Sequence, residues 1–131
     1  MRKITDHVVN GLNEAIAITA TDAPGPGGAN HKYAVVVYPR ADAWIGEPVK
    51  PVVELEVVFQ NGPVGEAGFN GLSNEALIAI VIDRLRGFQH GRTLTGDIDE
   101  NVRGKYACRE NACALTHFQE GLMWLQKRTQ D

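Results

Sequence analysis

Cysteine and long apolar runs are both scarce in this sequence of 131 residues. The two cysteines, Cys108 and Cys113, are five apart in an expected helix, where they point to different sides and cannot easily form a disulfide. We interpret them as the reduced thiols of a cytoplasmic protein. No run of eighteen apolar residues occurs, and no apolar run follows the N-terminus, so we expect neither a membrane-spanning helix nor a signal peptide.

An excess of basic charge is also missing. The chain has 13 Lys and Arg against 16 Asp and Glu, a formal net charge of −3, which argues against a nucleic-acid polymer as a partner. Basic residues nevertheless gather between positions 84 and 109: Arg84, Arg86, Arg92, Arg103, Lys105 and Arg109. The acidic residues in this interval that follow Arg84 are Asp97, Asp99 and Glu100. Such local positive charge suits a small anion.

The N-terminal half is typical of β-structure. Short runs rich in β-branched and aromatic residues predict strands at 15–20, 32–38 and 52–59. Turn residues at 22–30 predict a long hairpin loop between the first two strands. Pro39 to Pro51 contains three prolines and Trp44 and cannot continue a β-ladder. We therefore expect a three-stranded antiparallel meander.

The last predicted strand alternates between polar and apolar residues. Glu54 and Glu56 are expected on its solvated face. The inward-facing residues are then Val53, Leu55, Val57 and Phe59. An apolar sheet face needs a cover, and we expect the C-terminal helices to supply it.

Two amphipathic segments, Ser73 to Gln89 and Ala107 to Arg128, predict a helical hairpin, with Ser73 as an N-cap. The first segment's apolar stripe is Leu77, Ile80, Val81, Leu85 and Phe88, with Ile78 and Ile82 beside it. The second segment's seam is Leu115, Phe118, Leu122 and Leu125. So much apolar surface predicts packing between the helices and against neighbouring chains.

The predicted fold class is therefore α+β, in one domain spanning 1–131. An N-terminal antiparallel β-meander, at about 1–62, precedes a C-terminal two-helix antiparallel hairpin, at about 63–131, and the chain is expected to be oligomeric. Between the helices, residues 91–106 are polar and predict a long mobile loop.

Several patterns that carry chemistry elsewhere are incomplete here. The glycines at 25–28 precede a strand rather than a helix, so a plain hairpin loop is favoured over a phosphate cradle. Cys113 and His117 have the spacing of two metal ligands, but no second pair completes a set, and no metal is expected. No nucleophile with a base and an orienting carboxylate is identifiable, so we predict no catalytic residue.

The most suggestive cluster is Arg103, Lys105 and Arg109, with Glu110, Asn111 and Thr116 in the helix that follows. Guanidinium groups match phosphate oxygens bidentately, and Asn and Thr can bond a base edge or a ribose hydroxyl. The alternative is a solvated helix face on which Arg109 pairs with a nearby carboxylate. The residues alone do not decide between these interpretations.

Longer motifs point to a family. Phe59–Pro63, Glu66–Gly71 and Asn74–Gln89, followed by Ala107–Arg128 with its Ala-Cys-Arg-Glu-Asn start, resemble the helical hairpin shared by the phage anti-CBASS and Thoeris anti-defence sponges. The earlier segment Gly27–Tyr33 looks more like the Thoeris anti-defence branch, which carries an N-terminal β part. The resemblance covers nearly the whole chain.

The resemblance implies a protein that is not an enzyme and needs no cofactor. Such sponges sequester cyclic oligonucleotides or cyclic ADP-ribose isomers such as glycocyclic ADP-ribose between subunits of a homo-oligomer, commonly a hexamer, in the cytoplasm of the infected host. Arg109 is then expected to hold phosphate, with Asn111, Thr116, Asn70 and Arg84 as further ligand-binding candidates.

One departure from the family concerns the segment between the helices. The family members that the chain resembles join their two helices through a short turn, whereas residues Gly91 to Tyr106 are inserted here. Arg103 and Lys105 lie in this insertion and are therefore candidates from charge alone. An enzyme that degrades such a signal, and a structural or protein-binding oligomer without a small ligand, stay open as alternatives.

Overall fold

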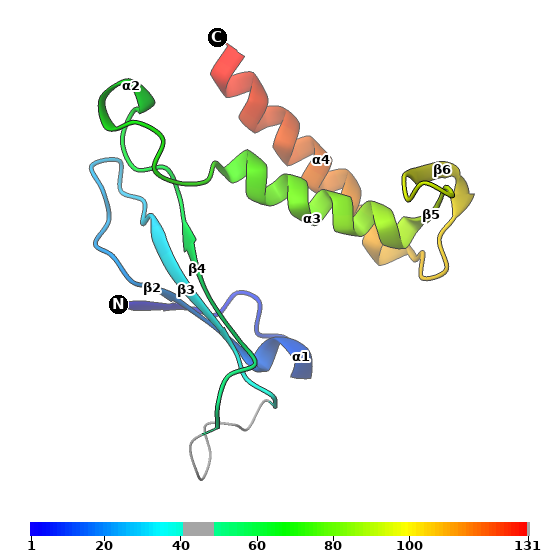
Figure 1. The fold of residues 1–131 in the computed structure, drawn as a ribbon, viewed down its shortest axis with the longest axis horizontal. Coiled ribbons are helices and arrows are strands. Elements are labelled where there is room, and N and C mark those ends of the chain that lie inside the picture. Colours follow the sequence, from blue (N-terminus) through cyan, green and yellow to red (C-terminus); the bar gives the residue numbers. More distant parts are fainter. Residues whose placement is uncertain (41–48, 131) are drawn as a thin grey trace. The chain divides into compact units, whose positions relative to one another are not determined.

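The computed structural model describes residues 1–40 and 49–130 and divides the chain into two compact units, Met1–Leu72 and Ser73–Asp131. Trp44 and most of the proline-containing connection lie outside the described residues. Each unit has its own secondary structure, strands in the first and two long helices in the second (Figure 1). That the chain forms one domain, in which the helices cover the sheet, stays a prediction.

The first unit is built on an antiparallel four-stranded sheet in the order β1-β2-β3-β4. Its strands are β1 (Arg2–Ile4), β2 (Ile16–Ala20), β3 (Lys32–Val37) and β4 (Val53–Val58). The predicted meander is confirmed in β2 to β4, and the loop at 22–30 joins β2 to β3 as expected. The sequence prediction missed β1 because three residues, two of them basic, are too short to show alternation.

A short helix, α1 (Gly11–Glu14), precedes β2 and is capped by Asn10, whose side chain accepts from the Asn13 N–H. Burial in this unit centres on Ala15 and Ala20. The predicted inward face of β4 is wrong for Val53 and Leu55, which are 42% and 47% exposed, because among the described elements β4 packs against β3 alone and nothing covers this part of the strand. Val57 and Phe59 are half-buried, and the Phe59 ring meets Tyr33 edge-on at 5.8 Å between centroids.

The second unit is a helical hairpin, as predicted. Its elements are α3 (Asn74–Gln89), β5 (His90–Arg92), β6 (Ile98–Arg103) and α4 (Arg109–Gln130). Ser73 is the predicted N-cap, because its Oγ accepts from the Ala76 N–H at 3.0 Å. The second helix begins at Arg109, two residues later than Ala107. Among the described residues, no helix is long and apolar enough to cross a membrane.

Residues 91–106 contain most of a β-hairpin in place of the mobile loop that the sequence predicts. β5 and β6 pair antiparallel, and their turn is closed by the Thr93 N–H to the Asp97 carbonyl at 2.7 Å (Figure 1). Gly96, with φ of +88°, supplies the left-handed residue that this turn requires. The pattern was missed because β5 is three residues long and β6 is mostly polar.

The helices pack through a face of α3 that is rotated from the predicted stripe, of which Leu85 and Phe88 are half-buried. Ile82 is 3% exposed and is flanked one turn away on the same face by the half-buried Ile78 and Leu85. The predicted stripe residues Leu77, Ile80 and Val81 are exposed instead, Ile80 by 63%. In α4 the predicted seam is correct for Leu115, Leu122 and Leu125, which are buried or half-buried, whereas Phe118 is 40% exposed.

The loop between β2 and β3 is organised by the half-buried Asp22. Its carboxylate accepts from the His31 N–H at 3.0 and 3.2 Å and from the Asn30 side-chain amide at 3.2 Å. Burial raises the pKa of Asp22, but hydrogen bonds from His31, Asn30 and the backbone of Lys32 outweigh this effect and hold the pKa below its ordinary value.

We expect this loop to be sensitive to acid. Because the folded-state pKa of Asp22 is lowered, its stabilising contribution is complete above the unfolded value of about 3.9 and is lost as pH falls through the folded value. An NMR pH titration should therefore show the His31 amide resonance moving with a midpoint below about 3.9. In Asp22→Asn this step should be absent, and a midpoint at or above the ordinary value would contradict the assignment.

Candidate ligand site at the tip of the helical hairpin

The tip of the hairpin is closed by a backbone contact at Gly104. Its N–H donates to the Gln89 carbonyl at 2.8 Å, which joins the end of β6 to the end of α3. Gly104 is buried, and a Cβ there would run into the Phe88 carbonyl oxygen and lie 2.9 Å from the His90 nitrogen. Only glycine allows the two chain segments to approach this closely.

The start of α4 is held by two side chains. The Gln89 Oε1 accepts from the Cys108 N–H at 2.9 Å, and the Cys108 Sγ accepts from the Asn111 N–H at 3.4 Å. The thiol occupies the place that a hydroxyl takes in a common N-cap, although sulfur is a weaker acceptor. Cys108 and Cys113 are free thiols, as the sequence predicted.

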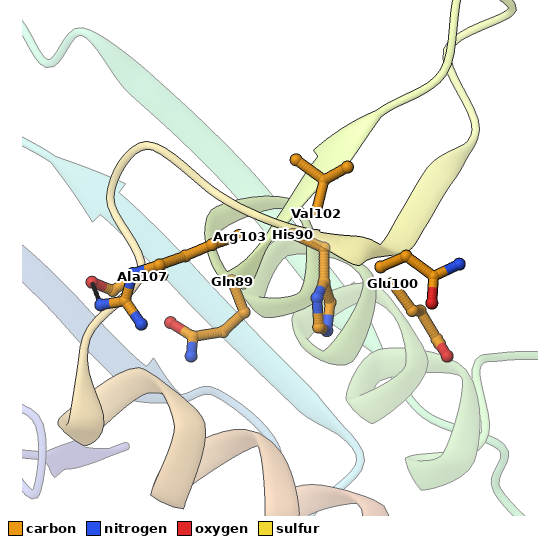
Figure 2. A pocket seen from close by; sticks show the side chains of 7 residues that line it. Gln89, His90, Glu100, Val102, Arg103 and Ala107 are labelled. Atoms are coloured by element: carbon orange, nitrogen blue, oxygen red, sulfur yellow. Dashed lines mark hydrogen bonds between the residues drawn. The ribbon is translucent and has the colours of Figure 1, made fainter.

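Beside this junction lies a hollow of about 300 Å³. It is lined by Gln89, His90, Glu100, Asn101, Val102, Arg103 and Ala107 (Figure 2). The Arg103 guanidinium donates to the Ala107 carbonyl at 3.0 Å, which holds the side chain along one side of the hollow. Of the lining residues, only Arg103 was predicted as a site residue, because the prediction in this segment followed basic charge and none of the other lining residues is an arginine or lysine.

Arg109 is the first residue of α4 and is exposed. It forms no ion pair with any described residue, so the alternative in which a carboxylate neutralises it gains no support from the structure. Its position at a helix N-terminus adds guanidinium charge to the positive end of the helix dipole and to exposed backbone N–H groups. Glu110 lies in the same first turn with the opposite charge, so the attraction for an anion at this end of α4 comes from Arg109 and the helix N-terminus.

The structure places the other α4 candidates on different sides of the helix. Thr116 follows Arg109 by seven residues, or two turns, and is exposed on the same face. Asn111 lies about 200° around the helix from Arg109 and is half-buried on the side that carries Leu115. Arg109 and Thr116 can thus contact one ligand, whereas Asn111 faces the packed side.

Two further candidates, Arg84 and Lys105, lie against aromatic rings. Arg84, exposed near the end of α3, lies with its guanidinium carbon 5.1 Å from the centre of the Phe88 ring, and the Lys105 Nζ lies 5.5 Å from the Tyr106 ring. Both contacts are cation–π interactions that leave N–H donors for a ligand.

Asn70 belongs to the first unit, where its side chain closes a loop around α2 (Val64–Ala67). Its Oδ1 accepts from the Asn61 N–H at 2.8 Å and its Nδ2 donates to the Asn61 carbonyl at 2.7 Å. These bonds give Asn70 a structural role in the turn. The neighbouring Phe69 is 90% exposed, a stacking group outside the predicted set of site residues.

The Gly104 contact predicts a large effect of a single methyl group. Gly104→Ala should lower the free energy of unfolding by about 1–3 kcal/mol, because the Cβ overlaps backbone atoms that cannot yield. Gly121→Ala is the matched control: it lies inside α4 with nothing within 4 Å of an added Cβ, and should stabilise by roughly 0.5–1 kcal/mol. Urea denaturation measures both, and equal effects would refute the contact.

Comparisons with known proteins agree with this architecture. The family model of the Acb2/Tad1 hairpin domain matches residues 51–130, a range that contains every predicted site residue. Thoeris anti-defense 1 from Bacillus phage SBSphiJ7 is 49% identical over 73 residues, which are 56% of this chain and 42% of that relative. The match therefore spans less than half of the relative's length. The resemblance found in the sequence, with its closeness to the Thoeris anti-defence branch, is confirmed, and the chain belongs to the Acb2/Tad1 hairpin domain family.

Proposed function

We propose that this chain is a phage or prophage anti-defence sponge that binds an immune signalling nucleotide and sequesters it without cleaving it. The ligand class is a cyclic ADP-ribose isomer or a cyclic oligonucleotide. Family membership supports this proposal, and so does the 49% identity to a protein named Thoeris anti-defense 1. Because the match covers 42% of that relative, the activity of the whole relative comes to this chain as part of the proposal.

The observation that carries the proposal is Arg109 at the start of α4. Among the described residues its guanidinium has no carboxylate partner, and Arg103 and Lys105 lie within the six preceding positions. Phosphate oxygens are the acceptors that such a fork binds bidentately, and a helix N-terminus adds N–H donors. Sequestration requires slow release of the ligand rather than a nucleophile.

We also propose that the protein works as a homo-oligomer, a hexamer, in the cytoplasm of the infected host, without a membrane or a nucleic-acid polymer as partner. Supporting the assembly, Ile80 on α3 and Met123 and Trp124 on α4 are 57–63% exposed although they are large and apolar. Exposed apolar surface of this kind commonly becomes buried between subunits. The net charge of −3 disfavours a nucleic-acid polymer.

Removal of the Arg109 guanidinium should weaken ligand binding. Isothermal titration calorimetry with cyclic ADP-ribose, its glycocyclic isomers and cyclic di- and trinucleotides identifies the ligand. Arg109→Ala should then lower the free energy of binding by about 1.5–3 kcal/mol, which raises Kd roughly 10- to 150-fold, because the substitution removes hydrogen bonds to a charged group. Arg128→Ala, at an exposed arginine near the other end of α4, should bind normally. Absence of heat with every nucleotide would refute the proposed function.

A second measurement separates a sponge from an enzyme that degrades the signal. After long incubation with excess protein, heat denaturation should release the nucleotide with its mass and retention time unchanged, because sequestration breaks no covalent bond. Nucleotide heated alone is the control. A product of altered mass would show catalysis. If the natural protein binds no nucleotide and Arg109→Ala keeps full anti-defence activity, a structural or protein-binding role would be favoured.

A further inference from the structure

We propose that the hollow between β6 and the start of α4 binds one ribose-phosphate unit of the nucleotide, with Arg103 and His90 at the phosphate and Glu100 at the ribose hydroxyls. This inference rests on the proposed function and deepens it by naming the residues that select a ribonucleotide. None of the three residues is on the same element as Arg109.

The backbone of β6 is shaped to form this hollow. His90 pairs with Arg103, yet the next residue of β5, Gly91, pairs with Asp99. The intervening residues of β6, Glu100 to Val102, therefore bulge out of the ladder. Bulges of this kind redirect side chains and are common beside binding sites. Here the bulge turns two polar residues, Glu100 and Asn101, toward the hollow.

The bulge is held in place by packing against glycine. A Cβ at Gly91 would lie 2.7 Å from the Val102 Cγ1, so the valine occupies the space that any other side chain at this position would need. Gly104 allows the equally close approach at the other end of the hollow. The shape of the hollow thus depends on two glycines that are next to its lining residues in sequence.

Two polar groups of the hollow, Arg103 and Gln89, are positioned before a ligand arrives. One N–H of the Arg103 guanidinium is bonded to the Ala107 carbonyl, which leaves four donors of the five that arginine carries. Gln89 is held by the Cys108 N–H. In the view of Figure 2 the Arg103 guanidinium and Glu100 lie toward opposite ends of the hollow, with Gln89 and His90 between them. Groups held in this way lose little conformational entropy on binding.

The chemistry of the lining favours a ribonucleotide. A volume of about 300 Å³ is at the small end of ligand sites and suits one nucleotide unit rather than a whole cyclic oligonucleotide. Guanidinium and imidazole groups donate to phosphate, whereas a carboxylate accepts from ribose hydroxyls, as it does in dinucleotide sites. Glu100 would repel a simple anion such as inorganic phosphate, which carries no ribose hydroxyls to compensate for the repulsion.

Calorimetry on the full chain tests this assignment with the same nucleotides. Glu100→Gln and Arg103→Ala should each raise, by tenfold or more, the Kd of every nucleotide that binds the natural protein. Glu120→Gln, an exposed glutamate on α4, is the matched control and should bind normally. The 2′-deoxy form of a bound cyclic dinucleotide should bind the natural protein and Glu100→Gln equally, because the hydroxyl that Glu100 recognises is missing. Inorganic phosphate should give no heat.

The outcomes distinguish this inference from the proposed function. Full affinity in Glu100→Gln, Asn101→Ala and Arg103→Ala, combined with weak binding in Arg109→Ala, would refute the proposed role of the hollow. The proposed sponge function would still stand. No binding by the natural protein would overturn both. Thermal unfolding shows whether a variant has lost the tip, and the exposed Glu100 and Asn101 keep the test valid if Arg103→Ala unfolds. In the natural protein, the His90 ring resonances should shift on binding.

Discussion

The second unit depends on the close approach of two backbone segments at Gly104. The bond from its N–H to the Gln89 carbonyl fixes the end of β6 against the end of α3. Arg103 immediately precedes this contact, and α4 begins five residues after it, so the contact sets the positions of the guanidinium groups on both sides. A side chain at position 104 would separate the segments and displace the hollow together with the start of α4.

Features with a local cause could be predicted from the sequence. Short runs rich in β-branched and aromatic residues located β2, β3 and β4, and the Ser73 cap marked the start of α3 within one residue. The β5–β6 hairpin could not be predicted in this way, because its strands are short and polar and its stability comes from non-local contacts. Gly91 under Val102 and Gly104 against the Phe88 carbonyl are contacts that no periodicity reveals.

The packing face of α3 shows another limit of sequence patterns. The helix is apolar on more than one side, so the stripe through Ile80 and the stripe through Ile82 both have helical spacing. The structure selects Ile82 for contact within the hairpin and leaves Ile80 exposed. At the tip of the hairpin, charge clustering drew attention to Arg103 and Arg109. It carried no information on the orientation of Asn111 or on Glu100 and His90, whose positions follow from tertiary contacts.

The electrostatics of the tip connect ligand binding with stability. Arg109 at the N-terminus of α4 is unfavourable for the helix, because a positive charge meets the positive end of the dipole. The Gln89 and Cys108 hydrogen bonds, together with the Glu110 carboxylate in the first turn, offset this effect and keep the helix start in place. A bound phosphate would remove this repulsion. It would also stabilise the folded tip, because it binds the folded state and not the unfolded chain. The charge that destabilises the empty helix end is therefore the charge that makes it bind an anion.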